Sequence, residues 1–135
     1  MKLNMSQLQE LLLQSLEHEK GGVQVYQTAL ECVVNTDLKQ EWQGYLDETR
    51  EHVRLLTDAI VALEIDPYLE TPGRQVVRYL GASLVQAMQM ALAAGPKDAA
   101  ELVACECVVN AETKDHLDWE LIGKCAEQLG GRQQK

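Results

Sequence analysis

Residues 5–34 read MSQLQELLLQSLEHEKGGVQVYQTALECVV, and apolar side chains recur in this stretch at steps of three and four. Such spacing predicts an amphipathic helix, because side chains three or four positions apart lie on one helix face. The apolar series consists of Met5, Leu8, Leu12, Leu16, Val23, Tyr26, Leu30 and Val33. The position that the series skips between Leu16 and Val23 is occupied by Glu19. We therefore expect a carboxylate on the buried face of the first helix.

Turn-forming residues divide the rest of the chain into three further helical segments. The breaks are the Asn-Thr-Asp at 35–37, the proline-containing stretch 66–73 and the Gly-Pro at 95–96. We expect helices at about 5–34, 37–64, 74–94 and 97–129, within one domain that covers residues 1–135. Four helices joined by short links predict an all-α protein, an antiparallel four-helix bundle.

A five-residue pattern occurs in both the second and the fourth predicted helix. Residues 48–52 read ETREH and residues 112–116 read ETKDH, about half the chain apart. In each copy the Glu and the His, four positions apart, lie on one helix face and can offer oxygen and nitrogen to one metal ion. A single pair of this kind is also typical of a solvated helix surface, and the duplication is what favours a metal site. The predicted metal ligands are Glu19, Glu48, His52, Glu112 and His116.

On these residues, and on the phrase AETKDHLDWELI at 111–122, the sequence resembles the ferritin-like superfamily. These are four-helix, carboxylate-bridged di-metal proteins that include bacterioferritins and rubrerythrins. The resemblance implies that Glu48 and Glu112 bridge the metals and that His52 and His116 are nitrogen ligands. It assigns Glu19 as a terminal carboxylate. It also implies an iron or manganese cofactor, of one or two ions, and oxidase, peroxidase or metal-handling activity.

The chain departs from that family in two places. Its Glu and His are four positions apart where the family has three, and residues 74–94 contain no Asp or Glu. The site is therefore open to three further interpretations: asymmetric, mononuclear or lost. Glu17 is the alternative to Glu19 as the carboxylate of the first helix.

The third predicted helix favours an alternative function. No charged residue occurs between Arg78 and Lys97, so this helix can be approached closely by a neighbouring helix or a second subunit. The alternative is a non-catalytic ferritin-like bundle that acts as an oligomeric scaffold or interaction protein with a degenerate metal site. In either case we expect a homo-oligomer in the form of a dimer.

Composition restricts the class of partner. The 135 residues include 12 basic and 21 acidic side chains, for a formal net charge of -9, which speaks against binding to nucleic acid or to an anionic membrane surface. No apolar run is long enough for a membrane span, and the first residues lack a signal-peptide pattern, so we expect a cytoplasmic protein. The 4 cysteines form no C-x-x-C pair and are predicted to be free thiols.

Overall fold

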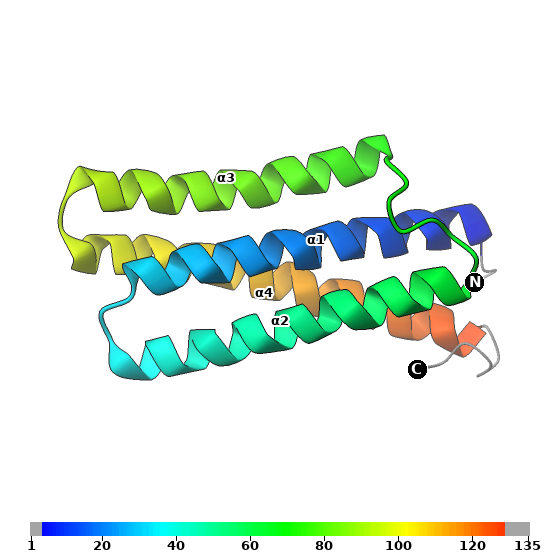
Figure 1. Cartoon of the computed structure of the whole chain (residues 1–135), viewed down its shortest axis with the longest axis horizontal. Coiled ribbons are helices and arrows are strands. Elements are labelled where there is room, and N and C mark those ends of the chain that lie inside the picture. The colour runs from blue at the N-terminus through cyan, green and yellow to red at the C-terminus, as the bar shows by residue number, and fades with distance from the viewer. Residues whose placement is uncertain (1–3, 129–135) are drawn as a thin grey trace.

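The computed structural model describes residues 4–128, which form four helices: α1 (Met5–Cys32), α2 (Thr36–Ala62), α3 (Pro72–Ala94) and α4 (Lys97–Gln128). Consecutive helices run in opposite directions, and no strand occurs within these described residues (Figure 1). α1 lies between α2 and α3 in this view, with α4 behind it, and α1 packs against all three other helices. The all-α prediction is confirmed, and the packing is consistent with a four-helix bundle.

The link between α1 and α2 differs from the predicted bounds: α1 ends two residues early and α2 begins one residue early. α1 ends at Cys32, two residues before the predicted end, because Val33 is already extended, with a ψ of 138°. α2 begins directly after Asn35, whose side-chain oxygen accepts hydrogen bonds from the backbone N–H groups of Asp37 and Leu38. This is the N-cap arrangement that supplies acceptors to the first turn of a helix.

The link between α2 and α3 also differs from the predicted bounds. α2 ends at Ala62 instead of residue 64, because Glu64 has a φ of 62°, a left-handed conformation that a helix cannot continue through. α3 begins at Pro72, earlier than predicted, since Thr71 caps it and proline suits the first helical position. The last residue of the fourth predicted helix, 129, lies outside the described residues.

The interior contains two separate apolar clusters. The first, which we call the Ala29 core, contains buried residues of all four helices: Val25, Tyr26, Ala29, Cys32, Val33, Trp42, Leu46, Met88, Ala100, Ala104, Cys107, Val108 and Ala111. The second, the Leu16 core, contains buried residues of α1 and α2: Leu8, Leu12, Leu13, Leu16, Leu56 and Ile60. On α1 the stretch 17–22 separates the two, and it carries both of the buried carboxylates of that helix.

α1 and α3 approach each other closely at a pair of glycines. A Cβ added to Gly81 would lie 3.6 Å from the Cα of Gly21, so the two backbones are almost in contact there. Larger side chains at both positions would push the helices apart. The close approach brings side chains at the start of α3 within reach of the middle of α1.

The buried face of α4 differs from the predicted one. Residues Leu102, Cys105, Val109, Glu112, His116 and Trp119 recur in the sequence at steps of three and four, which predicts that they face the interior, but Leu102 and Val109 are 69% and 63% exposed. The buried side chains are instead those of Ala100, Ala104, Cys107, Val108, Ala111 and Asp118. Small side chains on this row let α4 lie close to α1 and α3, which compensates for leaving larger apolar groups in solvent. Relative to the predicted orientation, α4 is therefore rotated about its axis, so that Asp115 faces inward and His116 faces solvent.

Two further predictions concern the chain's environment. All four cysteines are free, as predicted, and Cys32 and Cys107 are buried. Within residues 4–128, none of the helices combines the length and the apolar character needed to cross a membrane.

Candidate metal centre

Glu19 is the most deeply buried carboxylate of α1. Its side chain is 3% exposed and lies between the Leu16 core and the Ala29 core. The indole Nε1–H of Trp119 donates a hydrogen bond of 3.2 Å to Oε2 of Glu19. Nδ1 of His52 lies 3.4 Å from Oε1 of the same carboxylate. In the described part of the chain, no lysine or arginine pairs with Glu19, and its basic neighbour is the imidazole of His52.

Asp115 completes a cluster of three potential metal ligands. One ligand atom each from Glu19, His52 and Asp115 lies within 4.8 Å of the other two. Nδ1 of His52 and Oδ1 of Asp115 are buried atoms without a hydrogen-bond partner among the described residues. An unsatisfied buried polar group costs about 1–3 kcal/mol, and native proteins rarely leave one without a reason. A proton on Glu19 can serve these groups in the metal-free protein, and a bound cation would satisfy all three at once.

The electrostatics of Glu19 follow from this packing. Burial, together with the hydrogen bond to Asp115 and the negative charge of Asp115, raises the pKa of Glu19 to about 9, and the hydrogen bond from Trp119 opposes this only in part. Two carboxylates that share a site cannot both ionise without a neighbouring positive charge. The protein alone therefore keeps Glu19 protonated at neutral pH, whereas a bound cation would allow both groups to ionise.

Trp119 covers the cluster on the side of α4. Its ring lies 5.0 Å from the His52 ring, centroid to centroid, with an angle of 54° between the planes. This contact restricts the orientation of the imidazole while the indole N–H holds the Glu19 carboxylate. One side chain thus positions two of the three candidate ligands.

The structure brings together two of the five residues that the sequence predicted as ligands, Glu19 and His52. Glu48 is exposed on α2, and the side chain of His116 is 81% exposed on α4, where it lies 3.8 Å from Glu120. The prediction that all five converge on one point is therefore corrected. The cause is the rotation of α4 and the position of Glu48 at the outer edge of α2, one turn before His52.

Glu112, the fifth predicted ligand, is half-buried and accepts a hydrogen bond from the hydroxyl of Tyr26. Burial and this hydrogen bond raise the pKa of Tyr26, so its phenol stays protonated. The Tyr26 ring also packs edge-on against Tyr45, with the ring centroids 5.8 Å apart. Glu112 is thus held outside the three-residue cluster, next to it along α4.

Glu17, the alternative to Glu19, faces a different helix. Its Oε1 lies 2.7 Å from Nε of Arg74 and 3.1 Å from Nη2 of Arg78, both on α3. Burial alone would raise the pKa of Glu17, but the hydrogen bonds from Arg78 and Arg74 and their positive charges outweigh it and lower that pKa. Glu17 is therefore neutralised by the protein itself.

Asp115 was not predicted as a ligand because the row through Leu102, Val109 and His116 predicts a buried face of α4 that excludes it. The signal that could have found it is the small-residue row Ala100, Ala104 and Ala111, which continues at helical spacing to position 115. Tightly packed helices select small side chains, so this row was a better guide to the buried face than the larger residues.

The chemistry of the donor set fits a transition metal. One imidazole nitrogen with carboxylate oxygens is the kind of mixed set that binds iron and manganese, and also zinc. Glu19, His52 and Asp115 come from α1, α2 and α4, so a bound ion would connect three helices.

We compared the chain with models of protein families, with curated proteins and with solved structures, and none of the three comparisons finds a match.

Proposed function

We propose that this protein is a divergent ferritin-like four-helix bundle that binds a single iron or manganese ion through Glu19, His52 and Asp115. The observation that carries the proposal is the pair of unsatisfied buried atoms, Nδ1 of His52 and Oδ1 of Asp115, which lie within ligand distance of the buried carboxylate of Glu19. A divalent cation satisfies all three groups at once.

The balance of charge supports a cation in preference to another ligand. Two carboxylates and a neutral imidazole present only acceptor atoms to the space between them when both carboxylates are ionised. An anion would be repelled, and a neutral donor would leave two negative charges buried, which costs several kcal/mol. A dication offsets both charges and leaves the imidazole nitrogen as a neutral ligand.

An iron or manganese ion in this position supplies redox and Lewis-acid chemistry, the basis of the oxidase, peroxidase or metal-handling activity that the resemblance implies. The part of the protein is to hold the ion away from bulk solvent between two apolar cores and to orient His52 through Trp119. A cytoplasmic location remains part of the proposal on the basis of the sequence.

The test is metal binding by the purified protein after chelation. Titration with Mn²⁺, followed by the loss of the free-ion electron paramagnetic resonance signal, is expected to give one bound ion per chain. Co²⁺ is expected to give visible absorption bands from a site with nitrogen and oxygen ligands. Glu19→Gln and Asp115→Asn should each lower the Mn²⁺ affinity by at least about tenfold, since each removes a charged ligand.

The matched controls are Glu48→Gln and His116→Ala, which alter exposed residues of the duplicated pentapeptide. Both variants should bind Mn²⁺ as the wild type does, and circular dichroism should show that all four variants are folded. Less than about 0.2 bound ions per chain in the wild-type protein would contradict the proposal. An equal loss of affinity in the His116→Ala control would assign the site to the pentapeptides instead.

A second candidate function, the oligomeric scaffold, is favoured by a separate observation. Large apolar side chains are exposed on α3 and α4, among them Tyr79, Met90, Leu102 and Val109. Exposed apolar groups of this number are typical of surfaces that contact a second subunit. Sedimentation equilibrium tests it, because the scaffold function predicts a dimer that Tyr79→Asp or Met90→Asp dissociates.

A further inference from the structure

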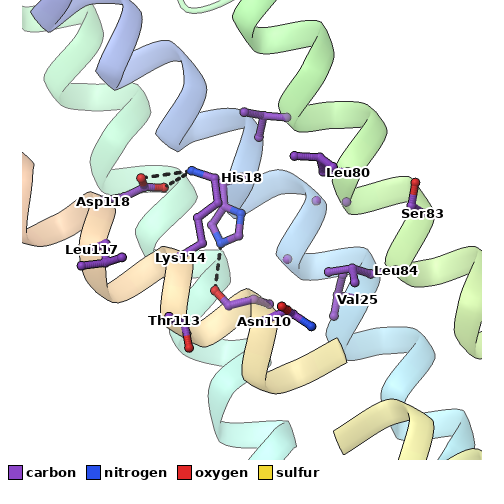
Figure 2. Close-up of a pocket in the computed structure, with 15 residues that line it drawn as sticks. His18, Val25, Leu80, Ser83, Leu84, Asn110, Thr113, Lys114, Leu117 and Asp118 are labelled. Atoms are coloured by element: carbon purple, nitrogen blue, oxygen red, sulfur yellow. Dashed lines mark hydrogen bonds and ion pairs between the residues drawn. The ribbon is translucent and has the colours of Figure 1, made fainter. Parts of the chain in front are cut away.

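A cavity of about 620 Å³ lies between α1, α3 and α4, beside the candidate metal centre. We call it the α3–α4 cavity. Figure 2 shows it bounded by Leu80 and Leu84 of α3, by Val25 of α1 and by Thr113 and Leu117 of α4. Its volume falls in the range of small-molecule binding sites, about 300–1,000 Å³.

The walls of the cavity are mainly apolar. They are formed by glycines of α1 and α3 together with the side chains of Val25, Val77, Leu80, Leu84, Ala111 and Leu117. Leu80 and Leu117 are 52% and 53% exposed, so both project from opposite helices at the edge of the cavity. An apolar molecule that enters would cover both leucines.

The charges at the cavity wall cancel. Nζ of Lys114 lies 2.9 Å from Oδ2 of Asp118, and these two residues carry the only Lys, Arg, Asp or Glu charges among the residues that line it. A charged ligand would have to break this ion pair or remain uncompensated in an apolar environment. The wall therefore favours an uncharged ligand.

His18 provides one directional polar group. Its Nε2 lies 3.0 Å from the backbone oxygen of Ala111, and because a carbonyl oxygen can only accept, Nε2 carries the proton (Figure 2). In the neutral ring, Nδ1 is then a hydrogen-bond acceptor. Nδ1 has no partner among the described residues. A ligand that donates one hydrogen bond can satisfy it.

We propose that the α3–α4 cavity binds an uncharged, mainly apolar small molecule whose single hydroxyl or N–H group donates a hydrogen bond to Nδ1 of His18. The inference is independent of the proposed metal site, because none of the three candidate ligands lines this cavity. The two sites adjoin on neighbouring faces of α4, with Ala111, Lys114 and Asp118 at the cavity and Asp115 at the metal centre.

The test uses two probes that differ only in the hydroxyl group: 2-naphthol and naphthalene. Both are expected to bind the wild-type protein with one molecule per chain, in the presence of a chelator as well as with Mn²⁺ added. 2-Naphthol should bind about threefold to tenfold more tightly, as expected for one hydrogen bond. Its binding should also shift the ¹⁵N resonance of Nδ1 of His18, and naphthalene should shift it much less.

Two variants assign binding to this cavity. His18→Phe removes the Nδ1 acceptor, and with it the bond from Nε2 to Ala111, but keeps a ring at the wall. It should abolish the preference for 2-naphthol and leave the naphthalene affinity within about twofold. Ser83→Trp places a large side chain at the wall and should weaken both probes at least about tenfold. Gln75→Trp, at an exposed position of α3 outside the cavity, is the matched control and should change neither affinity.

Several results would overturn the proposal. The proposal is overturned if neither probe binds up to its solubility limit. It is also overturned if 2-naphthol binds the wild type and His18→Phe with equal affinity. If the protein sediments as a dimer that Ser83→Trp dissociates, and neither probe binds, a second copy of the chain covers the cavity instead. Failure of Mn²⁺ binding with intact naphthol binding would overturn only the metal site.

Discussion

Glu17 and Glu19 are two buried carboxylates of the same helix, and the protein treats them in opposite ways. Side chains two positions apart on a helix point in directions that differ by about 200°, so Glu17 and Glu19 face different neighbours. Glu17 points to α3, where Arg74 and Arg78 contact it. Glu19 points to α2 and α4, where it meets His52, Trp119 and a second carboxylate, Asp115. The first site is complete within the protein, whereas the second lacks a positive charge.

The different surroundings of Glu17 and Glu19 indicate which of the two carboxylates needs a bound cation. Two arginines lower the pKa of Glu17 in spite of its burial, but burial and Asp115 raise the pKa of Glu19 to about 9. A buried acid without a lysine or arginine partner is therefore a better indication of a metal site here than the Glu/His spacing, because that spacing also occurs at Glu112 and His116, which lie outside the cluster. Three predictions follow from this comparison.

The largest effect is expected from removal of the arginine beside Glu17. Arg74 is 2% exposed, and its Nη1 also donates to the backbone oxygens of Pro67 and Leu69, at 2.6 and 3.1 Å. Arg74→Ala leaves these acceptors and much of the Glu17 charge unpaired, so the free energy of unfolding in urea should fall by about 3–5 kcal/mol.

The matched control for this variant is Arg54→Ala. Arg54 lies 2.6 Å from Glu51, but both side chains are largely solvent-exposed. Its loss should leave the stability nearly unchanged, because exposed ion pairs contribute little. Equal effects of the two substitutions would show that the Glu17 site is not the internally neutralised site described here.

The second prediction concerns the metal-free protein in chelator. There, Glu17 and Glu19 should make the free energy of unfolding depend on pH in opposite directions. The folded-state pKa of Glu17 is lowered, so its contribution to stability is present above about pH 5 and is lost as the pH falls. The folded-state pKa of Glu19 is raised from 4.5 to about 9, so the unfolded state ionises first and stability falls as the pH rises between these values. Urea unfolding measured across this range tests both signs.

Two variants separate the contributions. Glu19→Gln should flatten the decline on the alkaline side, and Glu17→Gln should reduce the loss on the acid side. Added Mn²⁺ should also remove the alkaline decline in the wild type, since the ion stabilises the ionised carboxylate. A wild-type protein whose stability rises steadily from pH 5 to pH 9 in chelator would contradict the charge assignment at Glu19.

The smallest effect is expected from Trp119→Phe. The substitution removes the N–H group that donates to Glu19 at 3.2 Å but keeps an aromatic ring beside His52. We expect a loss of about 1 kcal/mol in the free energy of unfolding, typical of one hydrogen bond. Mn²⁺ binding should persist with reduced affinity, because Trp119 positions a ligand and is not one itself. Complete loss of Mn²⁺ binding would contradict a purely positioning role for Trp119.

Sequence reasoning was accurate where one apolar face dominates a helix. On α1 the predicted apolar series is largely buried, with Leu8, Leu12, Leu16 and Tyr26 in the interior, and the apolar residues that recur on α2 at steps of three and four, Trp42, Leu46, Leu56 and Ile60, are buried as well. Glu19 was recognised because it interrupts such a row. The break at 35–37 was also predicted, since the local turn chemistry of Asn and Asp does not depend on tertiary packing, and the structure uses Asn35 as the N-cap there.

The fourth helix could not be oriented in the same way. Apolar residues surround α4, so hydropathy alone does not choose between the row through Leu102 and Val109 and the row through Ala104 and Ala111. The choice depends on how closely α4 packs against its neighbours, which is a property of the folded protein. Asp115 and the α3–α4 cavity both follow from that choice, and neither was predicted.

The most direct measurement of the central claim is the position of a bound ion. Crystals of the protein soaked in Mn²⁺ and measured near the manganese absorption edge show the ion as an anomalous difference peak. The account predicts one strong peak in contact with Glu19, His52 and Asp115. A peak at the exposed Glu48 or His116, or no peak near Glu19 at saturating Mn²⁺, would contradict it.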